Sequence, residues 1–592
     1  MNTYPQVAIM GNYTLTFKIR INGAPRKFEY NVSSIGEQFP EVKMSFCGSE
    51  TSDSNRYFDL EFCGNDSGIK AVLHPKMPFE IVSAKVDFLH EYAPGDLVYS
   101  AGYQSWTTVK EYAANEYCRD IIPLAMGKTL RHYAGISADD EIVGKYPEKP
   151  GMIHSVTYTY IKNGEDMILM GSMDEKYGYT IFRTDMNKGS FSIERDTKGV
   201  FVRGGSYDLF DVRFFKGGYD EVFDGYFGAM NLRKPAIDHL AGYTSWYNYF
   251  QKIDENIILR DLDGLDRVSD KVSIFQIDDG YETFVGDWLD PCDKFPNGMK
   301  YIADKVHAKG YLAGIWLAPF NVQIKSRTFK EHPDWILRDE KGKPVMGCMG
   351  WGGAYTLDFY KPEVKAHIRH FFDVILNDWG FDMVKLDFLY SECHTARYGK
   401  SRGQIMCEAM DFLRECCGDK LILGCGLPIG ASFGRVDACR ISCDADLKYS
   451  GKFYNKLHVN NEIPSAVNAI NNSIFRRHLN GRVFVNDPDV FFLRDNNLDY
   501  TDEQKLLLAT INNMFGNVLF VSDNAGDYDE YKCGIVSHMF TKSDFKIKDA
   551  GYIGSECVRI TIDGQNGDRI FKFNIRTGEV YDDAGLKFFA SK

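Results

Sequence analysis

The chain has 592 residues, too many for one hydrophobic core, so we expect about two to four domains. Its formal net charge of −13 argues against a nucleic-acid partner, because no basic field is available to replace the counterions of a phosphate backbone. That charge suits an enzyme acting on a neutral small molecule. The sequence contains no uninterrupted apolar window of about 18 residues, so we predict no membrane span.

The N-terminus lacks a basic region followed by an apolar stretch, so we predict no signal peptide and a cytoplasmic location. The 14 cysteines are scattered and form no CxxC pair, which is typical of reduced thiols. His394 stands beside Cys393 without further ligands at metal spacing. We therefore expect neither a metal site nor an organic cofactor.

Residues 1–235 read as β structure. Tyr13–Ile21 and Arg26–Val32 alternate apolar and polar residues, and Asn22-Gly23 lies between them. This pattern predicts a β-hairpin, since Asn-Gly accepts the positive φ angles of a tight turn. Similar short runs separated by glycine-rich turns follow, so we predict an N-terminal β-sandwich domain.

Strands alternate with amphipathic helices over residues 236–530. This alternation predicts a (β/α)8 barrel, the catalytic domain. The helices include Met299–Lys309, Pro362–Trp379 and Arg402–Cys417. The eight predicted strands are Gly242–Trp246, Val272–Asp278, Tyr311–Ala318, Met383–Phe388, Leu421–Cys425, Ala438–Asp444, Val483–Asp487 and Val518–Asp523. The short gap between the fifth and sixth strands has little room for a full helix.

Residues 531–592 return to strand-like alternation. Val558–Ile562 and Arg569–Ile575 are the clearest runs, and they predict a C-terminal antiparallel β-domain.

Among the carboxylates at the ends of the predicted barrel strands, Asp387 and Asp444 are the most informative pair. Functional groups of a barrel collect at the carboxyl ends of its strands, where two acids can flank a glycosidic bond. Lys385 lies two residues before Asp387 and therefore shares its side of the strand. Arg440 and Asp444 share a side if their strand stays regular.

The other strand ends are rich in polar and aromatic residues. A sugar needs carboxylate acceptors, cationic donors and an aromatic face, and the strand ends supply these as Trp246, Tyr247, Asp278, Asp279, Trp316, Lys385 and Arg440. The fifth strand ends with Cys425 between two glycines. Structural interpretations stay open: turn formation for Asp278-Asp279 and for the aspartates flanking Pro488, ion pairing for Lys385 and Arg440, and core packing for Trp316.

A set of motifs in this order resembles the α-galactosidases of glycoside hydrolase family 36. The resemblance runs through the barrel and reaches the front domain, where Gly102–Trp106 resembles a segment that lends a tryptophan to the site. The barrel segments are Gln276–Gly280, Gly286–Trp288, Gly314–Pro319, His332–Trp335, Lys385–Phe388, Leu423–Gly426, Arg440–Asp444 and Asn486–Asp489.

The resemblance implies a role for each matching residue. Asp387 would be the nucleophile and Asp444 the general acid/base. Asp278 and Asp279 would accept the hydroxyls at C4 and C6 of galactose, and Lys385 would bind near C3 and C4. The remaining implied groups are Cys425 and Arg440 near C2, the walls Trp106, Trp246, Tyr247 and Trp316, and Trp351 in a loop that affects the room beside C2.

These roles predict a retaining exo-glycosidase that releases terminal α-galactose. Retention predicts carboxyl groups about 5–5.5 Å apart. We expect Lys385 to help keep Asp387 ionised, and a less polar setting to keep Asp444 protonated before attack. The resemblance also makes a homo-oligomer plausible.

Several alternatives remain. The same scaffold suits an α-N-acetylgalactosaminidase if there is room beside C2, or a galactosyl-transferring enzyme that excludes water. A non-catalytic sugar-binding protein is a third alternative, which the presence of both Asp387 and Asp444 disfavours. A metal-dependent barrel enzyme is disfavoured because the carboxylates lack histidine partners.

Overall fold

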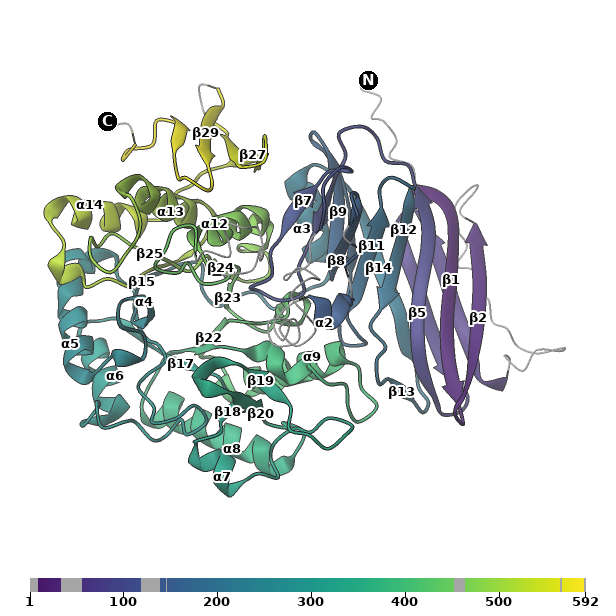
Figure 1. The fold of residues 1–592 in the computed structure, drawn as a ribbon, viewed down its shortest axis with the longest axis horizontal. Helices are drawn as coiled ribbons and strands as arrows, with labels where there is room; N and C mark the ends of the chain where they lie inside the picture. The colour runs from purple at the N-terminus through teal and green to yellow at the C-terminus, as the bar shows by residue number, and fades with distance from the viewer. Residues whose placement is uncertain are drawn as a thin grey trace.

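The computed structural model describes residues 9–33, 56–118, 139–144, 146–147, 149–451, 464–564 and 567–589 (Figure 1). Residues 1–8, on which much of the signal-peptide prediction rests, lie outside this part. No helix within these ranges is long and apolar enough to span a membrane.

Two seven-stranded antiparallel sheets form the N-terminal part of the molecule, on the right in Figure 1. In strand order, the first contains β2 (Ala24–Ser33), β1 (Ile9–Ile21), β5 (Phe79–His90), β12 (Ser190–Arg195), β11 (Thr180–Asp185) and β8 (Met152–Val156), with β13 (Phe201–Val202) also paired to β5. The second contains β3 (Phe58–Asn65), β4 (Gly68–Pro75), β14 (Tyr207–Gly217), β10 (Asp166–Ser172), β9 (Tyr158–Asn163), β6 (Leu97–Ser100) and β7 (Lys110–Tyr112).

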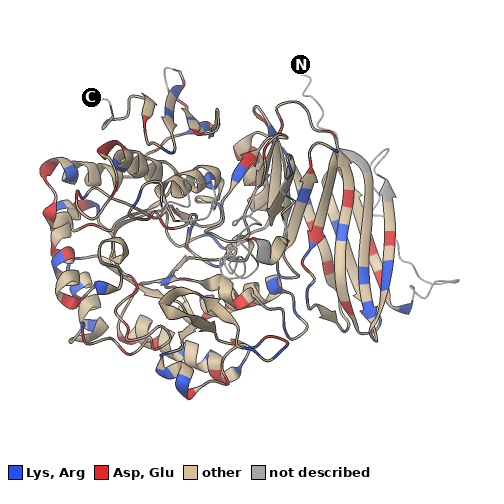
Figure 2. Cartoon of the chain, viewed as in Figure 1, with Lys and Arg blue, Asp and Glu red and all other residues tan. Residues whose placement is uncertain are grey.

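The hairpin prediction is confirmed. Ile21 pairs with Ala24, and Asn22 and Gly23 between them have φ angles of 49° and 81°. Along β1 the apolar side chains, such as Leu15 and Phe17, are buried between the sheets. Threonines and charged residues alternate with them, and Figure 2 shows charges spaced along β1, β2 and β5.

The second region is a parallel barrel. In sheet order its strands are β24 (Val485–Asp487), β23 (Ala438–Arg440), β22 (Leu421–Gly424), β21 (Met383–Leu386), β17 (Leu312–Leu317), β16 (Ile274–Ile277), β15 (Leu240–Thr244), β26 (Val518–Val521) and β25 (Val490–Phe491). β24 and β25 are two parts of one stretch, separated only by Pro488 and Asp489, so the sheet closes on itself.

All eight predicted barrel strands are present. The first has the predicted length but begins two residues earlier, at Leu240, and the other seven are shorter than predicted. The seventh is split because Pro488 has no N–H for the ladder and Asp489 adopts a φ of 79°. The two halves therefore pair with different neighbours, β24 with β23 and β25 with β26.

Helices surround the barrel (Figure 1). The three helices named from the sequence are α6 (Gly298–Ala308), α8 (Pro362–Asp373) and α9 (Arg402–Cys417). The others include α5 (Glu255–Gly264), α12 (Ala466–Phe475), α13 (Asp502–Phe515) and α14 (Glu530–Met539). Between β22 and β23 the structure contains only the short α10 (Ile429–Ser432), so the expected lack of a full helix there is confirmed.

Two smaller sheets complete the described chain. One was not predicted: β18 (Asn321–Gln323), β20 (Ala354–Thr356) and β19 (Met346–Cys348) follow β17. The other is the predicted antiparallel C-terminal sheet, β27 (Ile547–Tyr552), β28 (Cys557–Ile562), β29 (Arg569–Asn574) and β30 (Val580–Asp583). The domain limits at 235/236 and 530/531 stay predictions.

The sandwich packs directly on the barrel. The N–H of Ser105 donates to the carbonyl of Leu427 at 2.9 Å, and the hydroxyl of Tyr99 donates to the carbonyl of Phe475 at 2.9 Å. On α9, a Cβ added to Gly403 would lie only 2.6 Å from the carbonyl oxygen of Glu175 in the sandwich. These contacts bring the segment Gly102–Trp106 to the rim of the barrel.

Candidate active site

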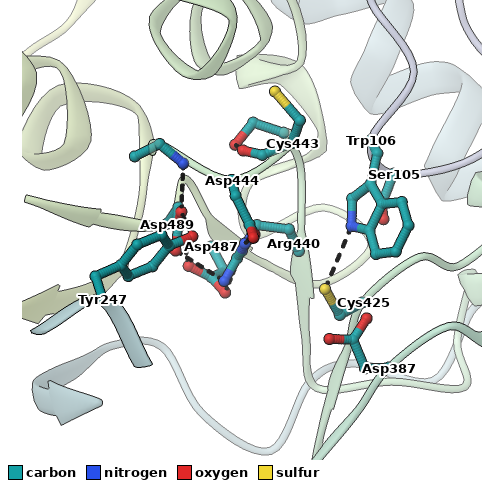
Figure 3. A network of polar contacts seen from close by, with 12 residues as sticks. Ser105, Trp106, Tyr247, Asp387, Cys425, Arg440, Cys443, Asp444, Asp487 and Asp489 are labelled. Atoms are coloured by element: carbon teal, nitrogen blue, oxygen red, sulfur yellow. Dashed lines mark hydrogen bonds and ion pairs between the residues drawn. The ribbon is translucent and has the colours of Figure 1, made fainter. Parts of the chain in front are cut away.

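Polar side chains gather at the carboxyl ends of the barrel strands and form two groups (Figure 3). Asp387, Cys425 and Trp106 lie together on one side. Arg440 lies among Asp444, Asp487 and Asp489 on the other.

Asp387 follows β21 directly and is buried. The Nε1 of Trp316, on the neighbouring β17, donates to Asp387 Oδ2 at 3.0 Å, and the N–H of Phe388 donates to Oδ1 at 2.8 Å. Phe388 has a φ of 53°, so the chain turns sharply there. Trp316 thus holds the carboxylate of Asp387, and its predicted role as a wall for sugar stays a prediction.

Burial raises the pKa of Asp387, and the nearby charge of Asp444 raises it further. Lys385 and the hydrogen bonds from Trp316 and Cys425 act in the opposite direction. The expected influence of Lys385 therefore has the right sign but does not outweigh burial.

Lys385 makes its ion pair with Asp278, the Nζ lying 2.7 Å from Oδ2. Both side chains are buried, and although burial alone would lower the pKa of Lys385, Asp278 raises it overall. The amide of Gln276 also donates to this carboxylate at 2.8 Å. The structural ion pair considered from the sequence is present, and it links two residues predicted to bind sugar.

Asp279 is the second acid of this pair and accepts bonds from two sides. The Nε1 of Trp351 donates to Oδ2 at 2.8 Å, and the amide of Gln251 donates to both carboxylate oxygens, at 2.9 and 3.1 Å. Burial raises the pKa of Asp279. Gln251 and buried Glu282, which also interacts with Asp279, were not predicted from the sequence.

Trp106 reaches the site from the sandwich. Its Nε1 donates to the Sγ of Cys425 at 3.4 Å, and its ring packs edge-on against Phe388 and Tyr390. A Cβ on Gly426 would lie 3.0 Å from the Trp106 ring, so glycine is needed where the indole passes. Cys425 therefore lies between Trp106 and Asp387 (Figure 3).

Asp444 differs from the sequence prediction in two ways. β23 ends at Arg440, so Asp444 stands on a loop and not at a strand end. Its side chain is 42% exposed and its Oδ1 lies 3.0 Å from Arg440 Nη1. The setting is therefore polar, and the expectation of a less polar setting is wrong.

Arg440 is buried and binds two further carboxylates. Its Nε lies 3.1 Å from Asp487 Oδ2 and its Nη2 lies 2.8 Å from Asp489 Oδ1. The hydroxyl of Tyr247 donates to Asp489 as well. Asp489 is the main residue that sequence reasoning missed, because a turn role explained Asp-Pro-Asp equally well. The motif Asn486–Asp489 was the available signal.

Trp246 begins α4 (Trp246–Tyr249) and is partly buried, with its ring edge-on to Phe250 at 5.0 Å. No described contact ties it to the carboxylates, so its wall role stays a prediction. Within the described ranges, no cluster of three His, Cys, Asp or Glu side chains has the arrangement of a metal site.

Residues 260–408 match the Melibiase family model. A galactosaminidase from Flavonifractor plautii, described as acting on A type blood α-D-galactosamine, is 29% identical over 196 residues, or 28% of this chain and 18% of the relative. α-Galactosidase Mel36A of Lactobacillus acidophilus is 31% identical over 123 residues, or 20% of this chain and 16% of the relative. The aligned part thus spans less than a fifth of either curated relative.

The solved structure of TtGalA, an α-galactosidase from Thermus thermophilus in complex with p-nitrophenyl α-D-galactopyranoside, resembles the chain over most of its length. The TM-score is 0.66 at 24% sequence identity, covering 85% of this chain and 98% of that protein. This likeness shows the fold: a β-sandwich, a barrel and a C-terminal β-sheet. Residues 260–408 are thus similar to the Melibiase family, and the chain has the fold of the family 36 α-galactosidases that its motifs resemble.

Proposed function

We propose that this chain is a retaining α-galactosidase that releases terminal α-linked galactose, with Asp387 as nucleophile and Asp444 as general acid/base. The observation that carries the proposal is the contrast between the two carboxylates. Asp387 is buried and aimed by Trp316 and Cys425, while Asp444 is half-exposed and close enough to influence the pKa of Asp387. The Melibiase match and the α-galactosidase fold support the choice of substrate.

In the first step, an Asp387 oxygen attacks the anomeric carbon. The bond from that carbon to the leaving oxygen breaks, and Asp444 gives its proton to that oxygen. In the second step, Asp444 takes a proton from water, the water oxygen attacks the anomeric carbon, and the bond to Asp387 breaks. Two inversions give α-galactose, so the configuration is retained.

The remaining side chains would hold the sugar. Asp278 and Asp279 offer carboxylate oxygens on one side, already oriented by Lys385 and Trp351. Trp316 and Trp351, whose ring centroids lie 5.8 Å apart, supply apolar surface for a sugar face. Such preorientation lowers the cost of ordering these groups when substrate binds.

An α-N-acetylgalactosaminidase is the second candidate, because the Flavonifractor plautii relative is named a galactosaminidase. The distinction concerns the space beside C2, which the resemblance assigns to Cys425 and Arg440. Cys425 is closed on its outer side by Trp106. An acetamido group would have to fit against these side chains.

Comparing p-nitrophenyl α-galactoside with its 2-acetamido analogue tests the choice. We expect kcat/KM to favour the galactoside by roughly 10-fold or more. A preference for the 2-acetamido substrate would favour the second candidate over the first. If neither substrate is hydrolysed, the alternative of a non-catalytic sugar-binding protein would be favoured. Following the anomer first formed by NMR tests retention, and β-galactose as the first product would contradict it.

A further inference from the structure

We propose that Asp489 is a positioning residue for the acid/base: it holds the loop that carries Asp444 from both sides, through Arg440 before it and the backbone N–H of Ala445 after it. The proposal rests on the proposed function and adds a residue to it. Asp489 itself need not touch the sugar.

The contacts of the Asp489 carboxylate bracket Asp444. Oδ1 lies 2.8 Å from Arg440 Nη2, and Arg440 in turn lies 3.0 Å from the Asp444 carboxylate. Oδ2 accepts the N–H of Ala445 at 2.8 Å. One buried side chain therefore fixes both the cation that binds Asp444 and the peptide unit that follows it (Figure 3).

The rest of the loop follows the same segment. The N–H of Ile441 donates to the carbonyl of Asp487 at 2.9 Å, and the hydroxyl of Ser442 is 3.3 Å from the carbonyl of Pro488. The stretch from 441 to 445 thus lies along residues 487–489 although β23 has already ended. These contacts hold the loop in place where the strand pairing of β23 has ended. Of residues 441–445, only Asp444 is not buried.

Asp489 is itself tightly held. It has a φ of 79°, which is unfavourable for a residue with a Cβ and persists only where surrounding contacts enforce it. Its N–H donates to Asp487 Oδ1 at 2.9 Å, and the hydroxyl of Tyr247 donates to its Oδ2. Strain of this kind, beside a predicted catalytic carboxylate, indicates a position selected for geometry.

The charges around Arg440 support the same role. A single guanidinium faces the carboxylates of Asp444, Asp487 and Asp489, so its charge is shared. Burial raises the pKa of Asp489, with Arg440 opposing and the other two carboxylates adding to the rise. Arg440 therefore orients Asp444 while being held in place by Asp487 and Asp489.

Leaving groups of different quality test the proposal. p-Nitrophenolate departs with little help from an acid, whereas the alkoxide of methyl α-galactoside needs a proton. We expect Asp489→Asn to lower kcat on the methyl glycoside by roughly 10-fold more than on the nitrophenyl glycoside, with KM little changed. Azide should raise turnover of the nitrophenyl substrate in the variant, because it needs no general base.

Asp523→Asn is the matched control. Asp523 is an equally buried rim carboxylate with an arginine partner, Arg494, and it accepts the N–H of Leu493 at 2.7 Å. It has no described contact with the loop of Asp444. Any activity that this variant loses should be lost equally on the two substrates, as a general weakening of the fold predicts.

Equal losses on both substrates for Asp489→Asn would overturn the proposal. If that variant does not fold, Tyr247→Phe provides the second measurement, since it removes only the hydroxyl that donates to Asp489. We expect Tyr247→Phe to lose less activity than Asp489→Asn, and again to lose more on the methyl glycoside than on the nitrophenyl glycoside. Equal losses on the two substrates would again overturn the proposal. A wild-type chain inactive on both galactosides would refute the proposed function instead.

Discussion

The two halves of the candidate site are built differently. Asp387 directly follows a strand and is buried, with donors from Trp316 on β17 and from Cys425 just after β22, and a covering tryptophan from the sandwich. Asp444 lies on a loop, 42% exposed, and is held through Arg440 and backbone contacts to the split seventh strand. A nucleophile gains from a fixed, dry setting, whereas a group that exchanges protons with water needs access to it.

The largest expected effect comes from the buried half. Asp387→Asn keeps the size of the side chain and removes the attacking oxygen's charge, so kcat/KM on p-nitrophenyl α-galactoside should fall by roughly 10⁴-fold or more. Steady-state kinetics measures this, with circular dichroism as the check on folding. Activity close to that of the wild type would show that another group attacks.

In the exposed half, the effect of a substitution on kcat should depend on the leaving group of the substrate. Asp444→Asn should lower kcat on methyl α-galactoside by about 10²–10⁴-fold, the usual scale of general acid catalysis, and lower it less on substrates with good leaving groups in the glycosylation step. Pre-steady-state measurement separates this step from release of the sugar. If the loss did not depend on the leaving group, Asp444 would not be the proton donor.

The buried half should also be the more sensitive one in stability. Lys385→Met would leave the carboxylate of Asp278 buried without its cation, and breaking such a pair costs about 3–5 kcal/mol. Denaturant unfolding measures the change. The double variant Lys385→Met/Asp278→Asn removes the uncompensated charge and should recover part of the loss, while equal instability of both variants would assign the effect to packing.

The sequence carried more information about the buried half than about the exposed one. Asp387 and Lys385 are placed by a regular strand, and the period of two predicts their shared side correctly. For Asp444 the condition of a regular strand is not met, because β23 stops at Arg440, although the two side chains still form an ion pair. Strand ends depend on which neighbours remain to pair, and this is a property of the closed barrel and not of local sequence.

The ion-pair and hydrogen-bond partners of the site residues could not be predicted from local sequence patterns either. Lys385 forms its ion pair with Asp278, which follows another strand. Arg440 forms ion pairs with Asp487 and Asp489, nearly fifty positions later in the sequence. Pro488 predicted a turn. Only the closed barrel, in which β24 pairs with β23 and β25 pairs with β26, shows that this turn places Asp489 beside Arg440. The contact from Trp106 was expected through the family resemblance alone, since 319 positions separate it from Cys425.

The smallest expected effect concerns how the buried half is joined to the sandwich. Glu175 lies at that junction, where its side chain lies against Gly430 of α10 and accepts the N–H of Thr180 at 2.7 Å. Burial raises the pKa of Glu175 to about 7, with Arg195 opposing. Between its ordinary pKa and about 7, the folded protein therefore keeps a proton that the unfolded chain has lost.

This proton gives the sign of a stability change with pH. The contribution is present at low pH and is lost as the pH rises through about 7, so unfolding free energy should fall over that range by up to about 3 kcal/mol. Glu175→Gln cannot ionise and should flatten the slope in denaturant unfolding followed from pH 4.5 to 8. Glu363→Gln, at an exposed position of α8, should keep the wild-type slope. A slope unchanged by Glu175→Gln would mean that Glu175 stays ionised, and that the junction beneath the buried half tolerates a charge.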